Sequence, residues 1–170
     1  IARINSKIKL REPEGVIDDW VINYNYSKNK NFSYFLIAQS SVDILEKLRS
    51  LKIHSSVDYA LSVQAGGNLV APYAVYQEIH MYVGNEKALE YFQKQMNLEN
   101  AEQGANLILM LPYYKHSVFH DSRIIDGLRV VSDIQLFLDL HSYPIRGLEQ
   151  AKHLMDKKIK PLFEKVNRNE

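Results

Sequence analysis

The chain has 170 residues, a length typical of one domain and sufficient for a substantial hydrophobic core. Hydrophobic residues make up 46% and charged residues 24%, a globular composition that excludes an intrinsically disordered chain. Lysine plus arginine number 21 and aspartate plus glutamate number 20, so the global charge of +1 gives no reason to expect a nucleic-acid-binding protein. The absence of cysteine excludes disulfides, thiolate zinc sites and a cysteine nucleophile.

The charge is unevenly distributed along the chain. Residues 1–11 carry four bases and no acid, residues 12–145 carry 10 bases and 16 acids, and residues 146–170 carry seven bases and four acids. A basic segment at either end can meet phosphate, although lysines on a solvated face are the simpler interpretation of the C-terminal run. No apolar run is long enough to span a membrane and no signal peptide is visible, so we expect a cytoplasmic protein with no membrane partner.

Residues 1–10, IARINSKIKL, alternate between apolar or small side chains and polar ones, which predicts a half-buried strand with a basic outer face. No partner strand precedes this pattern, and the chain begins at Ile1 rather than at a methionine. We therefore expect residues 1–10 to be an edge strand or the remnant of a strand from a preceding domain, and residues 11–170 to form one α/β domain.

The next elements carry clear start signals. Pro13 suits the first turn of a helix whose apolar residues recur at helical spacing as far as Tyr24. The apolar run in residues 32–38 predicts a buried strand. Ser40 followed by Asp43 resembles a capping box and predicts the start of another helix.

The middle of the chain continues the alternation of strands and helices. Pro112–Ser122 has the composition of a long loop, and Arg123–Val131 predicts one strand that is distorted at Gly127. We further predict strands at residues 57–63, 77–83 and 105–111, a turn or closely packed helix entry at Gly66-Gly67, a short helix within residues 68–76, and a helix opened by Gly84-Asn85.

In the last part of the chain, Ser132 is a suitable cap for a helix that Tyr143-Pro144 ends. Apolar residues spaced three and four apart from Leu148 to Val166 predict a last helix that kinks before Pro161. Strands and helices interleave throughout, so we predict an α/β fold, with mixed α+β as the alternative, in which helices flank a central sheet.

One candidate site combines the glycine pair with the strand that follows it. A nucleotidyltransferase core places two small residues before a strand with two carboxylates one residue apart, because the glycines let the backbone approach a triphosphate and the carboxylates hold metal ions. Here Gly66 and Gly67 precede Glu78, but the second position is His80, whereas phosphoryl-transfer metals prefer oxygen ligands. The interpretations are an active transferase, a degenerate relative of that fold, or a coincidence in which His80 is a structural residue.

Two further patterns lie in residues 112–122. His116 and His120 are four residues apart and Asp121 follows; on a helix, side chains with this spacing can bind zinc. The surrounding sequence is not helical and favours a mobile or interface loop. Tyr113-Tyr114-Lys115 can stack on bases or pack on a partner, and the simpler interpretation is a surface loop with half-buried rings.

The most specific stretch runs from Val131 to Ala151. It contains Ser132-Asp133-Ile134-Gln135, then Leu138-Asp139-Leu140, then Pro144-Ile145-Arg146-Gly147-Leu148-Glu149-Gln150-Ala151. This stretch resembles the C-terminal region of the AbiEi-type antitoxins, the transcriptional-regulator half of type IV toxin–antitoxin systems. The opening is similar to the junction of that family, where a winged-helix domain ends in a wing strand and leads to a helix that carries Trp20 and Tyr24 here.

The resemblance implies a regulator rather than an enzyme, with no cofactor and no metal. It implies a domain that counteracts a cognate toxin, by contact with the toxin or indirectly, and that supports autoregulation of the operon. Operator DNA would be bound through the winged-helix domain, which is missing before residue 1. Candidate phosphate contacts are Arg3, Lys7 and Lys9 near that domain, and Arg146, Lys152, Lys157, Lys158 and Lys160 as a second surface.

The motif residues also have a physical interpretation that needs no partner. Gln135 and Asp139 are four residues apart and share one helical face. Gly147 allows a tight turn, and Arg146 can cap the preceding helix or pair with Asp139, while Glu149 lies in the next turn. These residues form either the corner between two helices or a surface for a partner or nucleic acid. The competing functions are a nucleotidyltransferase-like or nucleotide-binding protein, and an interaction module that uses residues 113–120.

Overall fold

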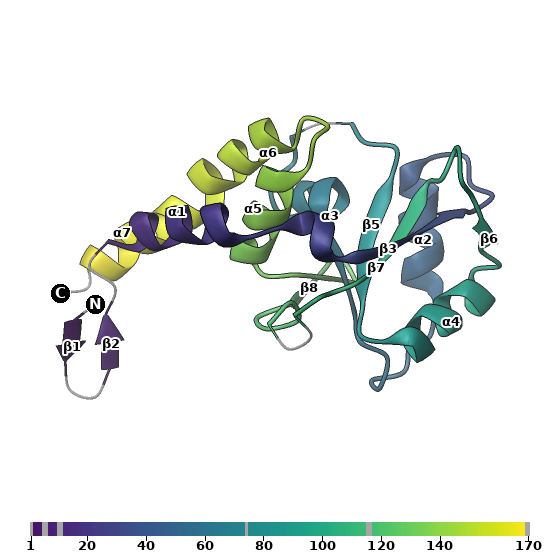
Figure 1. Ribbon diagram of the computed structural model, residues 1–170, viewed down its shortest axis with the longest axis horizontal. Coiled ribbons are helices and arrows are strands. Elements are labelled where there is room, and N and C mark those ends of the chain that lie inside the picture. The colour runs from purple at the N-terminus through teal and green to yellow at the C-terminus, as the bar shows by residue number, and fades with distance from the viewer. Residues whose placement is uncertain (1, 5–6, 10–11, 74, 115–116, 169–170) are drawn as a thin grey trace.

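The computed structural model of the chain describes residues 2–4, 7–9, 12–73, 75–114 and 117–168. A two-stranded hairpin of β1 (Ala2–Ile4) and β2 (Lys7–Lys9) precedes helix α1 (Pro13–Asn23). The rest of the described chain forms one seven-stranded mixed sheet with helices on both of its faces (Figure 1). The predicted α/β class and the central sheet flanked by helices are therefore confirmed.

The sheet combines parallel and antiparallel pairs. The β5–β7 and β4–β9 pairs are parallel, and the other neighbours are antiparallel. The central strands are buried on both faces, which explains their nearly continuous apolar sequences. In spatial order the strands are β6 (Glu99–Asn100), β3 (Lys30–Phe35), β7 (Leu107–Leu111), β5 (Ile79–Val83), β4 (Tyr59–Ser62), β9 (Leu128–Val130) and β8 (Arg123–Ile125).

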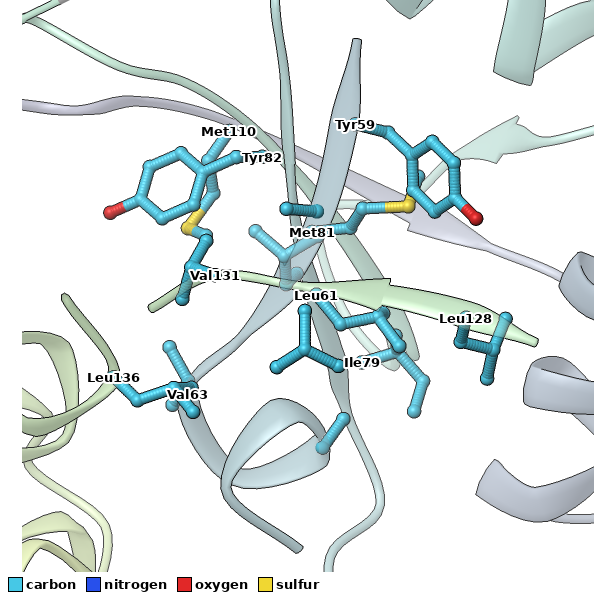
Figure 2. Close-up of a cluster of buried hydrophobic side chains, with 14 of the residues drawn as sticks. Tyr59, Leu61, Val63, Ile79, Met81, Tyr82, Met110, Leu128, Val131 and Leu136 are labelled. Atoms are coloured by element: carbon cyan, nitrogen blue, oxygen red, sulfur yellow. The ribbon is translucent and has the colours of Figure 1, made fainter. Parts of the chain in front are cut away.

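The two faces of the central strands differ in polarity. Figure 2 shows Tyr82 and Tyr59 on opposite sides of the sheet, with Met110 beside Tyr82 and Met81 on the side of Tyr59. The register places Ser62 opposite His80, and Tyr82 follows two residues later on the same face. Three polar side chains therefore point to one face of the sheet, whereas Leu61 and Met81 make the opposite face apolar.

Helices cover both faces. Figure 1 shows α3, α5 and α6 on one side of the strands and α2 and α4 on the other. Ser40, Asn85 and Ser132 each accept a backbone hydrogen bond as the cap of the following helix, which confirms the predicted starts. The helices are α2 (Ser41–Ser50), α3 (Val63–Val70), α4 (Glu86–Gln95), α5 (Asp133–Ser142), α6 (Gly147–Leu154) and α7 (Lys160–Arg168), with a short 3-10 helix η1 (Tyr26–Lys28) and a π-helical segment η2 (Met155–Ile159).

Three sequence predictions of local structure are wrong. Residues 1–10 do not form one strand, because β1 and β2 pair with each other as a hairpin. Gly66-Gly67 is part of a closely packed helix, the second of the two predicted alternatives, but that helix spans Val63–Val70, whereas the short helix was predicted within residues 68–76. Residues 123–131 form two strands, β8 and β9, because Asp126 (φ 47) and Gly127 (φ 75) both adopt the left-handed conformation of a tight hairpin turn.

The last helix is irregular at the predicted place. The π-helical segment η2 lies directly before Lys160-Pro161, where proline removes a backbone donor and interrupts the regular helix. In Figure 1, α1 and α7 extend together from the body, and the β1–β2 hairpin lies at the end of this extension. Among the described residues no helix is both long and apolar enough to cross a membrane.

Candidate functional site

The Asp139 carboxylate is the most deeply buried acidic group in the described chain. It lies on α5, is fully buried, and faces the polar side of the central strands. Ser62 donates a hydrogen bond to Oδ2, and the hydroxyls of Tyr24 and Tyr82 both donate to Oδ1. Three hydroxyl groups, from the residue that ends α1 and from strands β4 and β5, thus converge on one carboxylate.

A second layer of polar groups surrounds this carboxylate. Gln135, one turn before Asp139, donates from Nε2 to Asp139 Oδ1 over 3.0 Å and to the Tyr114 hydroxyl over 2.8 Å. Tyr114 in turn donates to the Tyr24 hydroxyl over 2.9 Å, and Asn29 donates to the Tyr82 hydroxyl over 3.1 Å. We call Tyr24, Tyr82, Tyr114, Ser62, Asn29, Gln135 and Asp139 the Asp139 network.

Burial controls the protonation of this network. Removal from water raises the pKa of Asp139 to about 6, although the hydrogen bonds from Ser62, Tyr24, Tyr82 and Gln135 act in the opposite direction. Burial also raises the pKa of the Tyr24 and Tyr82 hydroxyls, and the Asp139 charge adds to this effect. The tyrosines therefore remain protonated donors at neutral pH.

The corner between α5 and α6 contains the second half of the predicted motif. Arg146 has φ 55, so the residue in the left-handed conformation is the arginine and not Gly147. Gly147 is required for a different reason, because a Cβ there would collide with the Leu140 carbonyl oxygen and lie 2.9 Å from Tyr143 Cβ. The predicted pairing of Arg146 with Asp139 is wrong, since Arg146 is exposed and pairs with Glu149 over 3.4 Å.

Glu78 and His80 lie together beside a polar cavity of about 640 Å³. His80 Nε2 is 3.8 Å from Glu78 Oε2, and the Tyr143 hydroxyl donates to the same glutamate oxygen over 3.2 Å. Burial lowers the pKa of His80 to about 4, so its imidazole is neutral at physiological pH. Among the described residues, its Nδ1 atom has no hydrogen-bond partner.

The glycine pair does not join Glu78 and His80 at that cavity. Gly66 and Gly67 lie inside α3, and both are buried against neighbouring helices. A Cβ on Gly66 would lie 2.8 Å from Leu136 Cδ2, and a Cβ on Gly67 would lie 2.6 Å from Gln150 Nε2. The glycines therefore serve close helix packing, and the structure does not assemble the predicted nucleotide site.

Comparison with known proteins places these features in a family. A family model described as "Transcriptional regulator, AbiEi antitoxin, Type IV TA system" matches residues 9–160. The chain belongs to this AbiEi antitoxin family. No curated protein and no solved structure matches it.

Within this AbiEi-family chain, the motif residues contribute to two different places. Gln135 and Asp139 share one helical face, as predicted, but that face is turned inward to the Asp139 network. Arg146, Gly147 and Glu149 build the α5–α6 corner. Gln150 continues it, because its Nε2 donates to the Gln64 carbonyl over 3.2 Å. The contacts of Gln135, Asp139 and Gly147 are those expected of structural residues.

The predicted basic residues occupy two regions. Arg3 lies in β1, and Lys7 and Lys9 lie in β2, but their side chains are outside the described part of the structure. The second set is exposed along α6, η2 and the start of α7, where Lys160 pairs with Asp156 over 2.9 Å. Its members are Arg146, Lys152, Lys157, Lys158 and Lys160.

The two described tyrosines of the predicted stacking pattern, Tyr113 and Tyr114, differ in their exposure. Tyr114 points inward to the Asp139 network, whereas Tyr113 is 42% exposed. His120 is exposed and lies 3.3 Å from Asp121, and no group of three or more potential ligands for a metal is present among the described residues. Lys115 and His116, the other residues of the predicted stacking and zinc patterns, lie outside the described residues.

Sequence reasoning did not connect the members of the Asp139 network. Tyr24 and Asp139 are 115 residues apart, and Tyr82 and Asp139 are 57 apart. The available signal was a polar residue on an otherwise apolar face: Asp139 within a leucine-rich helix, and Ser62 at the end of an apolar strand. A buried polar group needs partners, so these residues predict a network but not its other members.

Proposed function

We propose that this chain counteracts a cognate toxin and supports autoregulation of its operon, and that it does so by binding rather than by catalysis. The family match over residues 9–160 is the observation that carries the proposal. The matched residues include the Asp139 network, the α5–α6 corner and every strand of the seven-stranded sheet.

The structure gives independent support against the nucleotidyltransferase alternative. That function needs a glycine loop that leaves its backbone open to a triphosphate. Gly66 and Gly67 are instead buried in α3 against Leu136 and Gln150. If nucleotide with Mg²⁺ raised the melting temperature and Glu78→Gln removed the rise, the alternative would be favoured over our proposal.

Two groups of basic residues are candidates for contact with the phosphates of operator DNA. Asp156 raises the pKa of Lys160 through a hydrogen bond, and the charge of Glu14 in α1 adds to this rise. The β1–β2 hairpin, with Arg3, Lys7 and Lys9, directly precedes α1. We propose that these residues and the α6–α7 lysines help to hold operator DNA that a preceding winged-helix domain binds.

A DNA-binding titration tests this part of the proposal. The double variant Lys157→Gln/Lys158→Gln removes two exposed lysines that form no salt bridge with the described residues. Two lost phosphate contacts lower the slope of log affinity against log salt by about 2. Lys87→Gln/Lys94→Gln on α4 is the matched control, with two exposed lysines on the other side of the sheet.

The measurement uses promoter DNA of the operon and a reporter gene under that promoter. We expect weaker binding and weaker repression for the Lys157/Lys158 variant, and wild-type behaviour for the control. Equal salt slopes for the wild type and both variants would exclude the α6–α7 surface from DNA contact.

A further inference from the structure

A cleft of about 650 Å³ opens beside the Asp139 network. Its walls come from α1, residues 113–114 and 117–121, the start of α5 and the junction of η2 with α7. A volume of this size is typical of sites for small molecules. We call the lining residues Tyr24, Tyr114 and Gln135 its floor; Tyr24 and Gln135 donate hydrogen bonds to the buried Asp139, and Tyr114 accepts one from Gln135.

Several aromatic rings line the cleft. Trp20, Tyr113 and Phe163 of α7 are among the residues that line it. The rings of Tyr113 and Tyr114 are 4.3 Å apart between centroids and nearly perpendicular. Trp20 is 49% exposed, so a large apolar surface is open to a ligand. Exposed aromatic rings favour a flat aromatic partner, because aromatic pairs pack in offset-stacked or edge-to-face contact.

One polar atom in the floor is available to a ligand. The Gln135 amide nitrogen donates to Asp139 Oδ1 and to the Tyr114 hydroxyl, which fixes the orientation of the amide. The carbonyl oxygen Oε1 of Gln135 accepts no hydrogen bond from the described residues. Unlike His80 Nδ1, which is fully buried without a partner, this oxygen is not completely closed off from solvent. It can therefore accept a hydrogen bond from a donor inside the cleft.

The charges at the rim disfavour an anionic ligand. Among the residues that the structure describes, the charged ones that line the cleft are Arg123, Asp121 and Asp133. Asp133 already pairs with Arg123, which leaves the acidic Asp121 beside His120. An anion would meet a carboxylate and no unpaired arginine among these residues, so a neutral ligand fits better.

We infer that this cleft binds an uncharged, flat aromatic heterocycle with a ring N–H, whose rings pack against Trp20 and Tyr113 and whose N–H donates to Gln135 Oε1. The aromatic lining favours a flat ring, and the open Gln135 acceptor favours a ring that carries a donor. This inference concerns a small-molecule site and depends on neither toxin contact nor DNA contact.

Indole and benzofuran are matched probes, because they share a shape and differ mainly in the N–H group. The chain contains one tryptophan, so the indole N–H peak of Trp20 in a heteronuclear NMR spectrum reports directly on the cleft. We expect both probes to move this peak, and indole to bind about fivefold more tightly, as one net hydrogen bond provides. Equal affinities for the two probes would overturn the assigned donor contact.

Two substitutions by phenylalanine locate the site. Ser117→Phe adds a ring to an exposed residue that lines the cleft, and we expect it to abolish the probe-induced movement of the Trp20 peak. Ser55→Phe adds the same ring to an exposed turn outside the cleft and should leave both affinities unchanged. No movement in the wild type at about 5 mM indole, which saturates a site of millimolar affinity, or wild-type binding by Ser117→Phe would overturn the inference.

Discussion

The Tyr82 hydroxyl donates a 3.0 Å hydrogen bond to Asp139 Oδ1, and this contact joins the central strand β5 to helix α5. The same hydroxyl accepts a hydrogen bond from Asn29, so it satisfies two buried groups at once. Leaving a buried polar group without a partner costs more than a hydrogen bond gains. The Asp139 network therefore fixes α1, α5 and the sheet relative to one another.

Replacing Tyr82 with phenylalanine should lower the free energy of unfolding by about 2–3 kcal/mol, because Asp139 loses a donor and Asn29 loses its acceptor. Tyr91→Phe is the matched control, since its hydroxyl donates to the Lys52 carbonyl at an exposed position. That change should stay within about 0.5 kcal/mol. Urea unfolding of both variants checks the prediction, and equal losses would show that the buried network adds no stability of its own.

Asp139 should make the chain less stable as the pH rises. Its pKa is about 6 in the folded state, above the ordinary value of 3.8, so its favourable contribution is complete below pH 3.8 and is lost as the pH rises through 6. The loss amounts to about 3 kcal/mol by neutral pH. The unfolding free energy of the wild type minus that of Asp139→Asn should fall by about 2.5 kcal/mol between pH 4 and pH 7. A difference that does not change with pH would contradict the raised pKa.

His80 should have the opposite pH dependence. Its pKa is about 4 in the folded state and 6.5 ordinarily, so its contribution is complete above pH 6.5 and is lost as the pH falls through 4. Relative to His80→Phe, which keeps a ring beside Tyr143, the wild type should lose about 3 kcal/mol between pH 7 and pH 4. Denaturant unfolding at several pH values measures this difference, and parallel curves for the two proteins would show that burial does not lower the His80 pKa.

Gly147→Ala should destabilise the chain by about 3 kcal/mol or more, because the new Cβ collides with the Leu140 carbonyl oxygen and displaces the α5–α6 corner. Gly15→Ala is the matched control in helix α1, where a Cβ meets nothing within 4 Å. That change should stabilise by about 0.5–1 kcal/mol. Thermal unfolding compares the two, and a Gly147→Ala variant as stable as the wild type would show that the corner can move without cost.

Local signals in the sequence predicted most elements correctly. The caps at Ser40, Asn85 and Ser132 depend only on residues within the same turn, so they could be recognised without knowledge of the fold. Asp126-Gly127 between apolar residues is an equally local signal for a hairpin, and it explains why one predicted strand is two.

Other features depend on contacts between distant residues. A helix through Gly66-Gly67 is unfavourable by intrinsic propensity, and it forms because α5 and α6 pack directly against the glycines. The sequence left Asp139 either in a structural corner or on a surface for a partner, because its hydrogen-bond partners Tyr24 and Tyr82 come from far along the chain. The cleft lined by Trp20 and Phe163 arises only when α1 and α7 meet the loop of residues 112–122.

Growth of cells that express the cognate toxin tests the central claim most directly. Co-expression of residues 1–170 should restore growth, and Lys87→Gln/Lys94→Gln, with changes only at exposed α4 positions, should restore it equally. Gly147→Ala should fail in proportion to its loss of folded protein. Growth arrest that persists when the wild-type chain is folded and abundant in the cells would contradict the antitoxin function.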